Sequence, residues 1–298
     1  MEITLSIVFA LCAALSNAVA TVLQRKAALT VPSSQGLRAG LMLDLLRRPI
    51  WLAGILAVIA AAVCQALALV TGPLTIVQPL FVLELPFTLI VASLLMQRRL
   101  PGTGWLAVAV VVAGLAVALA AAAPTGNRTH VPLDRWIPAL AVCMGLVFAL
   151  ALAALRRPEG RARAACLGAA TAISYAVTAA LLKSATHILD DRGLAAFFSA
   201  WQTYAFAATG VCALFLLENA MQAGPLVASQ PALTLGDALV SLALGIILYE
   251  ETIRSGWWLL PQLLGVALIA AGVLALSRIP FTQAVVAPEE EREAEKRE

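Results

Sequence analysis

Long apolar runs separated by short polar and charged segments form the main pattern of this 298-residue chain. A helix needs about 20 apolar residues to cross the hydrocarbon core of a bilayer, and runs of that length recur along the whole chain. We therefore predict an all-α polytopic membrane bundle of about nine transmembrane helices. The predicted spans cover residues 4–24, 50–70, 74–96, 104–123, 137–155, 164–185, 195–217, 226–249 and 258–277.

The composition agrees with a membrane protein and excludes several other classes of protein. Hydrophobic residues make up 61% of the chain and charged residues only 12%, whereas a soluble domain carries about a quarter charged residues. The 20 Lys and Arg residues lie in loops rather than in one patch, so nucleic-acid binding is not expected. The five cysteines lie in apolar runs without paired spacing, and we expect no disulfide, metal centre or cofactor from them.

The distribution of basic residues predicts the orientation in the bilayer. When the loops are assigned alternately to the two sides, most Lys and Arg residues fall on the side of the C-terminus. We therefore expect a multi-pass plasma-membrane protein with its N-terminus outside and its C-terminus in the cytoplasm. The Ala- and Arg-rich composition points to a bacterial source.

Two charged segments lie outside the spans. Residues 36–48 are too short to cross a bilayer at about 1.5 Å per residue. Leucines on one face predict an interfacial amphipathic helix near this position. A tenth, re-entrant segment within residues 27–49 is the alternative. The charged tail, residues 281–298, is predicted to be a disordered cytoplasmic segment.

An internal repeat relates the two ends of the chain. The same residues recur in one register: Gly72-Pro73-Leu74, Gln78-Pro79 and Gly104-Trp105 match Gly224-Pro225-Leu226, Gln230-Pro231 and Gly256-Trp257. The first four spans then correspond to the last four, and the odd shift of five spans inserts the halves in opposite orientations. This predicts an inverted 4+1+4 repeat, with halves at 1–125 and 159–280 and a connector helix at 126–158. Chance similarity in an Ala/Leu-rich chain is the alternative.

These motifs and their order resemble the drug/metabolite transporter (DMT) superfamily of EamA-like repeats. The nine-span layout is similar to the branch described as magnesium-transporter-like, or NIPA-like, over residues 4–277. The resemblance implies the transporter fold and transport by alternating access. The chain departs from the superfamily at the Gly-Glu-Arg-like turn, where it has Gln97-Arg98-Arg99 and Tyr249-Glu250-Glu251. It also has acids where the magnesium branch carries small polar residues.

Two acids form the strongest candidate site. Glu84 and Asp237 lie near the middle of the third and eighth spans, one residue apart after the repeat is applied. A charge at this depth costs about 2.5–3.5 kcal/mol, which a proton, a cation, a basic substrate or a polar pocket must offset. We interpret both as substrate or coupling-ion residues. The alternative is a protonated acid that hydrogen-bonds a neighbouring helix.

Prolines and amides extend the candidate site. Pro79, Pro86 and Pro231 each remove a helical hydrogen bond, and the freed carbonyls need partners or a water-filled cavity. We predict helix breaks there, with packing kinks as the alternative. The further candidates for the substrate or coupling-ion site are Gln78, Gln230, Asn17 and Tyr175. For each of them, an interhelical contact worth about 0.6 kcal/mol is the competing interpretation.

Other polar residues are expected to serve the membrane surface. Lys183 is expected to reach the headgroups, the acids Glu250 and Glu251 to be solvated, and His130 and His187 to lie in outer loops. Small residues in the fourth and ninth spans, such as Gly114 and Gly265, allow close helix contacts. Such contacts would form within one protomer or in a homodimer.

The sequence contains no nucleophile–base pair, phosphate loop or metal-ligand cluster, so an enzyme is not expected. Our first interpretation is a secondary active transporter that moves a small metabolite or drug-like solute across the plasma membrane by alternating access, with proton coupling as an option. The first alternative is a transporter of Mg²⁺ or another divalent cation, with Glu84 and Asp237 as the metal ligands. The second is a non-transporting membrane scaffold or receptor subunit.

Overall fold

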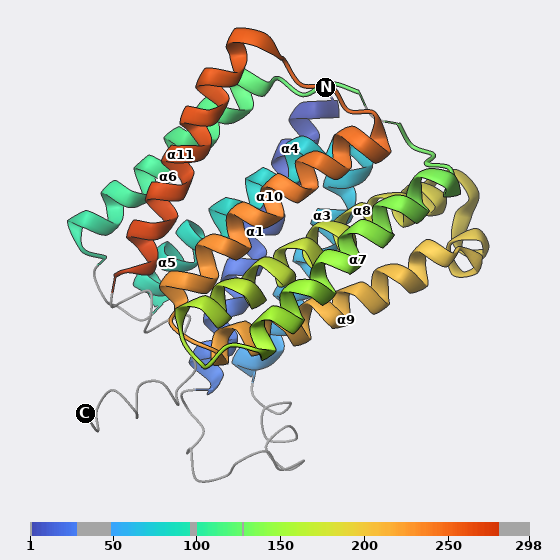
Figure 1. Ribbon diagram of the computed structural model, residues 1–298. Coiled ribbons are helices and arrows are strands. Elements are labelled where there is room, and N and C mark those ends of the chain that lie inside the picture. Colours follow the sequence, from blue (N-terminus) through green and yellow to red (C-terminus); the bar gives the residue numbers. More distant parts are fainter. Residues whose placement is uncertain (1, 29–48, 96–99, 127, 280–298) are drawn as a thin grey trace, which may run out of the picture.

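The computed structural model describes residues 2–28, 49–95, 100–126 and 128–279, and these residues form helices joined by short turns, with no strand among them (Figure 1). Within these ranges, nine helical spans are long and apolar enough to cross a membrane. The predicted all-α membrane bundle is therefore confirmed. The segments 29–48 and 280–298, which include the predicted interfacial helix, most of the re-entrant alternative and the charged tail, lie outside the described residues.

Twelve helical elements make up the nine spans, and the third span contains three of them. The elements are α1 (Glu2–Ala28), α3 (Pro49–Thr71), α4 (Leu74–Leu80), η1 (Phe81–Leu83), α5 (Glu84–Leu95), α6 (Gly102–Ala122), α7 (Leu133–Leu155), α8 (Arg161–Ser199), α9 (Trp201–Gln222), α10 (Leu226–Tyr249), η2 (Gly256–Trp258) and α11 (Leu259–Ser277). The second, third and eighth spans end within about a residue of their predicted limits.

The largest boundary error concerns the sixth and seventh spans. The sequence predicted that the sixth span ends near residue 185, but α8 continues to Ser199, bends at Gly193 (φ 78°) and is followed by the extended residue Ala200. Asp190 and Asp191 are exposed on this extension. Charged residues need not interrupt a helix that has already left the apolar core. The seventh span therefore begins at Trp201 rather than at 195.

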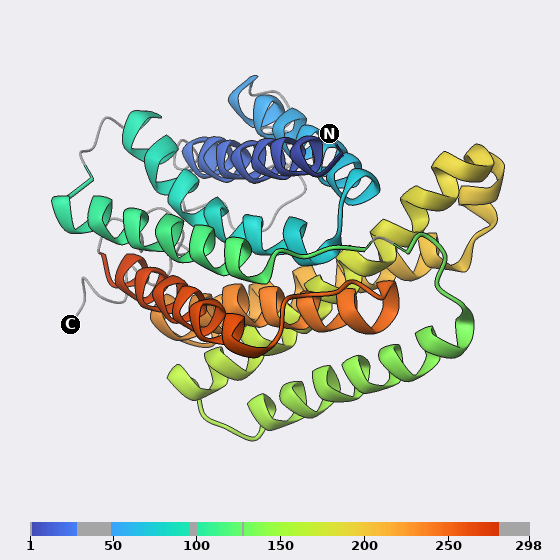
Figure 2. The same ribbon diagram turned by 90° about the horizontal axis from the view of Figure 1, so that it is seen from above.

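The helices alternate in direction, so the bundle has two distinct ends (Figure 1). We call the end where α1, α4, α7, α9 and α11 begin the N-terminal end of the bundle. α11 finishes at the opposite end, as an odd number of spans requires. In the view from above, α1 and α3 lie together on one side of the bundle and α7 on the other (Figure 2).

Small residues allow the helices to approach closely. α8 packs against α7, α9 and α10, and a Cβ on its Gly168 would lie 2.7 Å from the Ser229 carbonyl oxygen of α10. α6 packs against α11 in the same way, and a Cβ on Gly265 would lie 2.6 Å from the Gly114 carbonyl oxygen. The small residues of the fourth and ninth spans thus serve contacts within one protomer.

Gly265→Ala is therefore expected to destabilise the protein by about 1–3 kcal/mol, because the added methyl group meets backbone atoms that cannot rotate away. The matched control is Gly145→Ala on α7, where a Cβ meets no atom within 4 Å. Thermal unfolding in detergent should show a lower melting temperature for Gly265→Ala and no loss for Gly145→Ala. Equal melting temperatures for the two variants would contradict the close packing of α6 on α11.

Candidate functional site

The third span is interrupted next to its only charged residue. α4 ends at Leu80, residues 81–83 tighten into the 3₁₀ turn η1, and α5 begins at Glu84. Pro79 and Pro86 flank this turn, and neither can donate a backbone hydrogen bond to the preceding helical turn. The two prolines therefore explain an irregular backbone beside an acidic side chain.

The eighth span lacks the matching interruption. α10 runs without a break from Leu226 to Tyr249 and passes through Pro231, contrary to the helix break expected there. A single proline removes one hydrogen bond, and membrane helices can continue past such a residue. The third span differs because it has a second proline, Pro86, two turns after the first. The irregular backbone therefore belongs to one half of the chain.

Glu84 and Asp237 lie close enough for their charges to interact. The Asn17 side chain on α1 lies near the Glu84 carboxyl group, and the Ser241 hydroxyl donates to Asp237 Oδ1 over 3.3 Å. The Tyr175 phenol on α8 lies near enough to both acids for their charges to act on it. Four helices thus bring the two acids together with a small set of neutral polar groups, which we call the acidic site.

The two glutamines lie away from the acidic site. Gln78 is buried on α4, and Gln230 is half-buried on α10. At about 1.5 Å per helical residue they are roughly 9–10 Å along the helices from the acids. In the described part of the chain, no side-chain hydrogen bond joins either glutamine to Glu84 or Asp237. Of the residues predicted for the site, the structure brings together Glu84, Asp237, Asn17 and Tyr175.

The acidic site contains no basic side chain among the described residues. All ion pairs among the described residues lie elsewhere and involve four other acids, namely Glu159, Asp191, Glu250 and Glu251. The same residues contain no group of three or more His, Cys, Asp or Glu side chains placed to hold a metal ion. The acidic site therefore offers two carboxyl groups, an amide, a hydroxyl and a phenol to a ligand.

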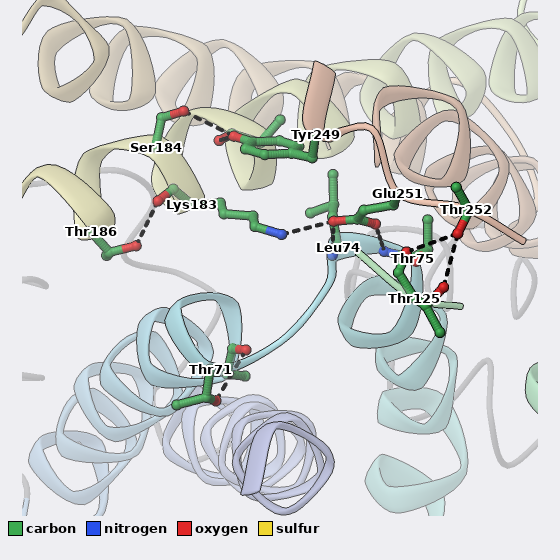
Figure 3. Close-up of polar contacts among 12 residues, drawn as sticks. Thr71, Leu74, Thr75, Thr125, Lys183, Ser184, Thr186, Tyr249, Glu251 and Thr252 are labelled. Carbon is green, nitrogen blue, oxygen red and sulfur yellow. Dashed lines mark hydrogen bonds and ion pairs between the residues drawn. The ribbon is translucent and has the colours of Figure 1, made fainter. Parts of the chain in front are cut away.

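A second polar centre lies towards the N-terminal end of the bundle, and the sequence did not predict it (Figure 3). The Lys183 ammonium donates to Glu251 Oε1 over 2.7 Å, and both side chains have no exposed surface. The backbone N–H of Leu74 donates to Glu251 Oε1 over 2.7 Å, and that of Thr75 donates to Oε2 over 2.8 Å. Lys183 therefore does not reach the headgroups, and Glu251 is not solvated.

The start of α4 explains why Glu251 is buried. The first N–H groups of a helix have no partner within the helix, and α4 starts after Pro73, which provides no side-chain cap. Glu250 adopts a left-handed conformation (φ 52°) that turns the chain after α10, and Glu251 then supplies the missing acceptor. Its negative charge also suits the positive end of the α4 dipole.

The Lys183 ammonium has aromatic as well as acidic surroundings. It lies 4.5 Å from the centroid of the Tyr249 ring. The Tyr249 hydroxyl donates to the Ala180 carbonyl and forms a 2.9 Å hydrogen bond with Ser184. These contacts hold α8 against the end of α10.

Backbone contacts extend this centre to the surface. Thr125 and Thr252 exchange two backbone hydrogen bonds of 2.9 and 2.8 Å, and the Arg254 N–H donates to Ala122 over 2.9 Å. At the protein surface, Glu250 pairs with Arg128 at 3.0 Å and with Arg135 at 2.6 Å. Glu250 thus remains partly exposed, as expected for a solvated acid.

The histidine predictions are half correct. His130 lies in an exposed segment and pairs with Asp191 over 3.6 Å. His187 was expected in an outer loop but is buried in α8, because that helix extends beyond its predicted end. The prediction for His187 was wrong because the sequence did not predict that α8 continues to Ser199.

Comparisons with known proteins add a family relationship. Residues 2–152 match the sequence model of a family described as "Magnesium transporter NIPA". An uncharacterized protein of Corynebacterium glutamicum is 31% identical over 280 residues, which cover 92% of this chain and 95% of that protein. No solved structure matches the chain.

Proposed function

The chain belongs to the NIPA family of magnesium transporters, and from this premise we propose that it carries Mg²⁺ or another hard divalent cation across the membrane. The observation that carries the proposal is that Glu84 and Asp237, on two different helices, lie near enough for their charges to interact, with Asn17 close to Glu84. The cation alternative thereby moves ahead of the small-metabolite interpretation that the sequence placed first.

The chemistry of the acidic site suits such a cargo. Mg²⁺ prefers oxygen ligands and keeps several of its waters, so one or two carboxylates can be enough to bind it. The Asn17 amide oxygen and a carbonyl freed by Pro86 could add to the two acids. A transported ion must also leave, which favours a binding site of few protein ligands over a cage built for permanent binding.

An organic cation is the second candidate, and Tyr175 is the observation that favours it. An aromatic face near carboxylates attracts ammonium groups through cation–π interactions, and this phenol lies within range of both acids. The same two carboxylates would then bind the charged end of a small metabolite, with proton coupling as an option.

We propose that transport proceeds by alternating access. In this scheme the halves 1–125 and 159–280 are inverted repeats that rock against each other around the acidic site, and α7 connects them. The protein lies in a bacterial plasma membrane, with its N-terminus outside the cell and its C-terminus in the cytoplasm. The start of α1 and the end of α11 lie at opposite ends of the bundle, which fits termini on opposite sides of the membrane (Figure 1).

Reconstitution tests the choice of cargo. Purified protein in liposomes that contain a fluorescent Mg²⁺ indicator should give saturable Mg²⁺ uptake, several-fold above that of protein-free liposomes. Other hard divalent cations should compete for uptake, and amphiphilic organic cations should not. Uptake of a labelled organic cation without any Mg²⁺ uptake would instead support the metabolite interpretation. Absence of both activities would favour a scaffold or receptor subunit.

A further inference from the structure

The polar contacts between the two halves gather at the N-terminal end of the bundle. Glu251, from the second half, accepts hydrogen bonds from Leu74 and Thr75 in the first half. The turn that follows α10 also pairs with the segment that follows α6, through Thr252 and Thr125. We call these five residues the N-terminal junction (Figure 3).

The opposite end of the bundle differs within the residues that the structure describes there. The Lys26 ammonium donates to Leu95, and both residues belong to the first half. The Gly160 N–H donates to Ala223, and both belong to the second half. The described polar contacts at the opposite end therefore do not join the first half to the second.

From this asymmetry we propose that the N-terminal junction is the gate on the N-terminal side of the acidic site, and that it is closed in this structure. The inference rests on the proposed alternating-access function. Opening the gate requires Glu251 to leave the start of α4 and the backbone pairing of Thr125 with Thr252 to separate.

The position of Lys183 makes such an opening physically reasonable. Lys183 lies on α8 and Glu251 follows α10, so both partners of the buried ion pair belong to the second half. When the halves separate, the pair moves as a unit and neither charge is left alone in a low-dielectric interior. The N–H groups of Leu74 and Thr75 then face the water that enters the opened gate.

A reversible cross-link tests the gate. Thr125 and Thr252 exchange both backbone hydrogen bonds, and residues paired in this way have Cα atoms about 5.5 Å apart, which suits a disulfide. The variant carries Thr125→Cys and Thr252→Cys, with the five native cysteines replaced by alanine. The full chain is oxidised in liposomes, and Mg²⁺ uptake is measured before oxidation, after oxidation and after reduction.

We expect oxidation to lower uptake at least 10-fold and reduction to restore it. The matched control joins two helices of the second half through Thr178→Cys and Thr209→Cys, whose native hydroxyls lie 3.0 Å apart on α8 and α9. Its oxidation should leave uptake unchanged. Full uptake by the oxidised Thr125/Thr252 variant, or failure of that pair to cross-link, would overturn the proposal.

Amide hydrogen exchange tests whether the gate opens without any measurement of transport. In lipid nanodiscs, amide exchange in a peptide covering residues 72–80 should slow about 10-fold when the Thr125/Thr252 pair is oxidised, because the N–H groups of Leu74 and Thr75 can no longer reach water. Equal exchange rates in the two redox states would overturn the gate. Absence of Mg²⁺ uptake in every variant, with slowed exchange, would count against the cargo and leave the gate supported.

Discussion

Glu251→Gln is expected to cause the largest loss of stability of any single polar substitution described here. Glutamine is nearly the same size, but it removes the charge that balances the fully buried Lys183 ammonium. Breaking a buried ion pair by removing one partner typically costs about 3–5 kcal/mol. For a chain of this size the melting temperature should fall by about 10 °C, as measured by thermal unfolding of the detergent-solubilised protein.

Three further variants separate the causes of this loss. Glu250→Gln makes the same chemical change next to Glu251, at a side chain that is 44% exposed, and should cost no more than about 1 kcal/mol. Lys183→Met combined with Glu251→Gln should recover part of the stability, since no charge is left unpaired. Exchange of the two charges should not restore stability, because a lysine at position 251 would face the positive end of α4. Wild-type stability in Glu251→Gln would contradict the buried pair.

Glu84→Gln and Asp237→Asn are expected to lower Mg²⁺ uptake by at least 10-fold while the protein still inserts and unfolds near the wild-type temperature. Each substitution keeps the shape of the side chain and removes the negative charge that a divalent cation requires. Because neither acid has an ion-pair partner among the described residues, its neutralisation leaves no counter-charge unpaired. Uptake into liposomes, normalised to the amount of reconstituted protein, measures the effect.

Glu159→Gln is the matched control for the site variants. This acid has an 80% exposed side chain and only a 3.8 Å contact with Arg163, far from the acidic site in the turn before α8. Its uptake should equal that of the wild type. If Glu84→Gln and Asp237→Asn also transported like the wild type, the two acids would not belong to the transport site.

The nine spans could be predicted because the bilayer imposes one strong requirement on the sequence. A membrane helix must be long and apolar along almost its whole length, and that property can be read locally. The extension of α8 to Ser199 escaped the same reasoning, because the charges at 190–192 look like a loop. Whether a charged segment continues a helix depends on where that helix leaves the apolar core, which local sequence does not reveal.

The polar centres show a similar division. Glu84 and Asp237 could be selected as a pair because each is the single charge in its predicted span. Lys183 and Glu251 were assigned to the membrane surface because they lie near predicted span ends. Glu251 contacts Leu74 across 177 positions of the chain, and no local pattern records such a contact. The one available signal was a helix that starts after Pro73 without a capping side chain.

The most direct test of the account is whether Mg²⁺ binds the folded protein through the two acids. Thermal unfolding should be followed with and without Mg²⁺, because a ligand at about 100 times its Kd adds roughly 2.7 kcal/mol of stability. We predict that Mg²⁺ raises the melting temperature of the wild type and of Glu159→Gln, and that the rise disappears in Asp237→Asn. An equal rise in the Glu84→Gln/Asp237→Asn double variant, or a rise with organic cations alone, would contradict the account.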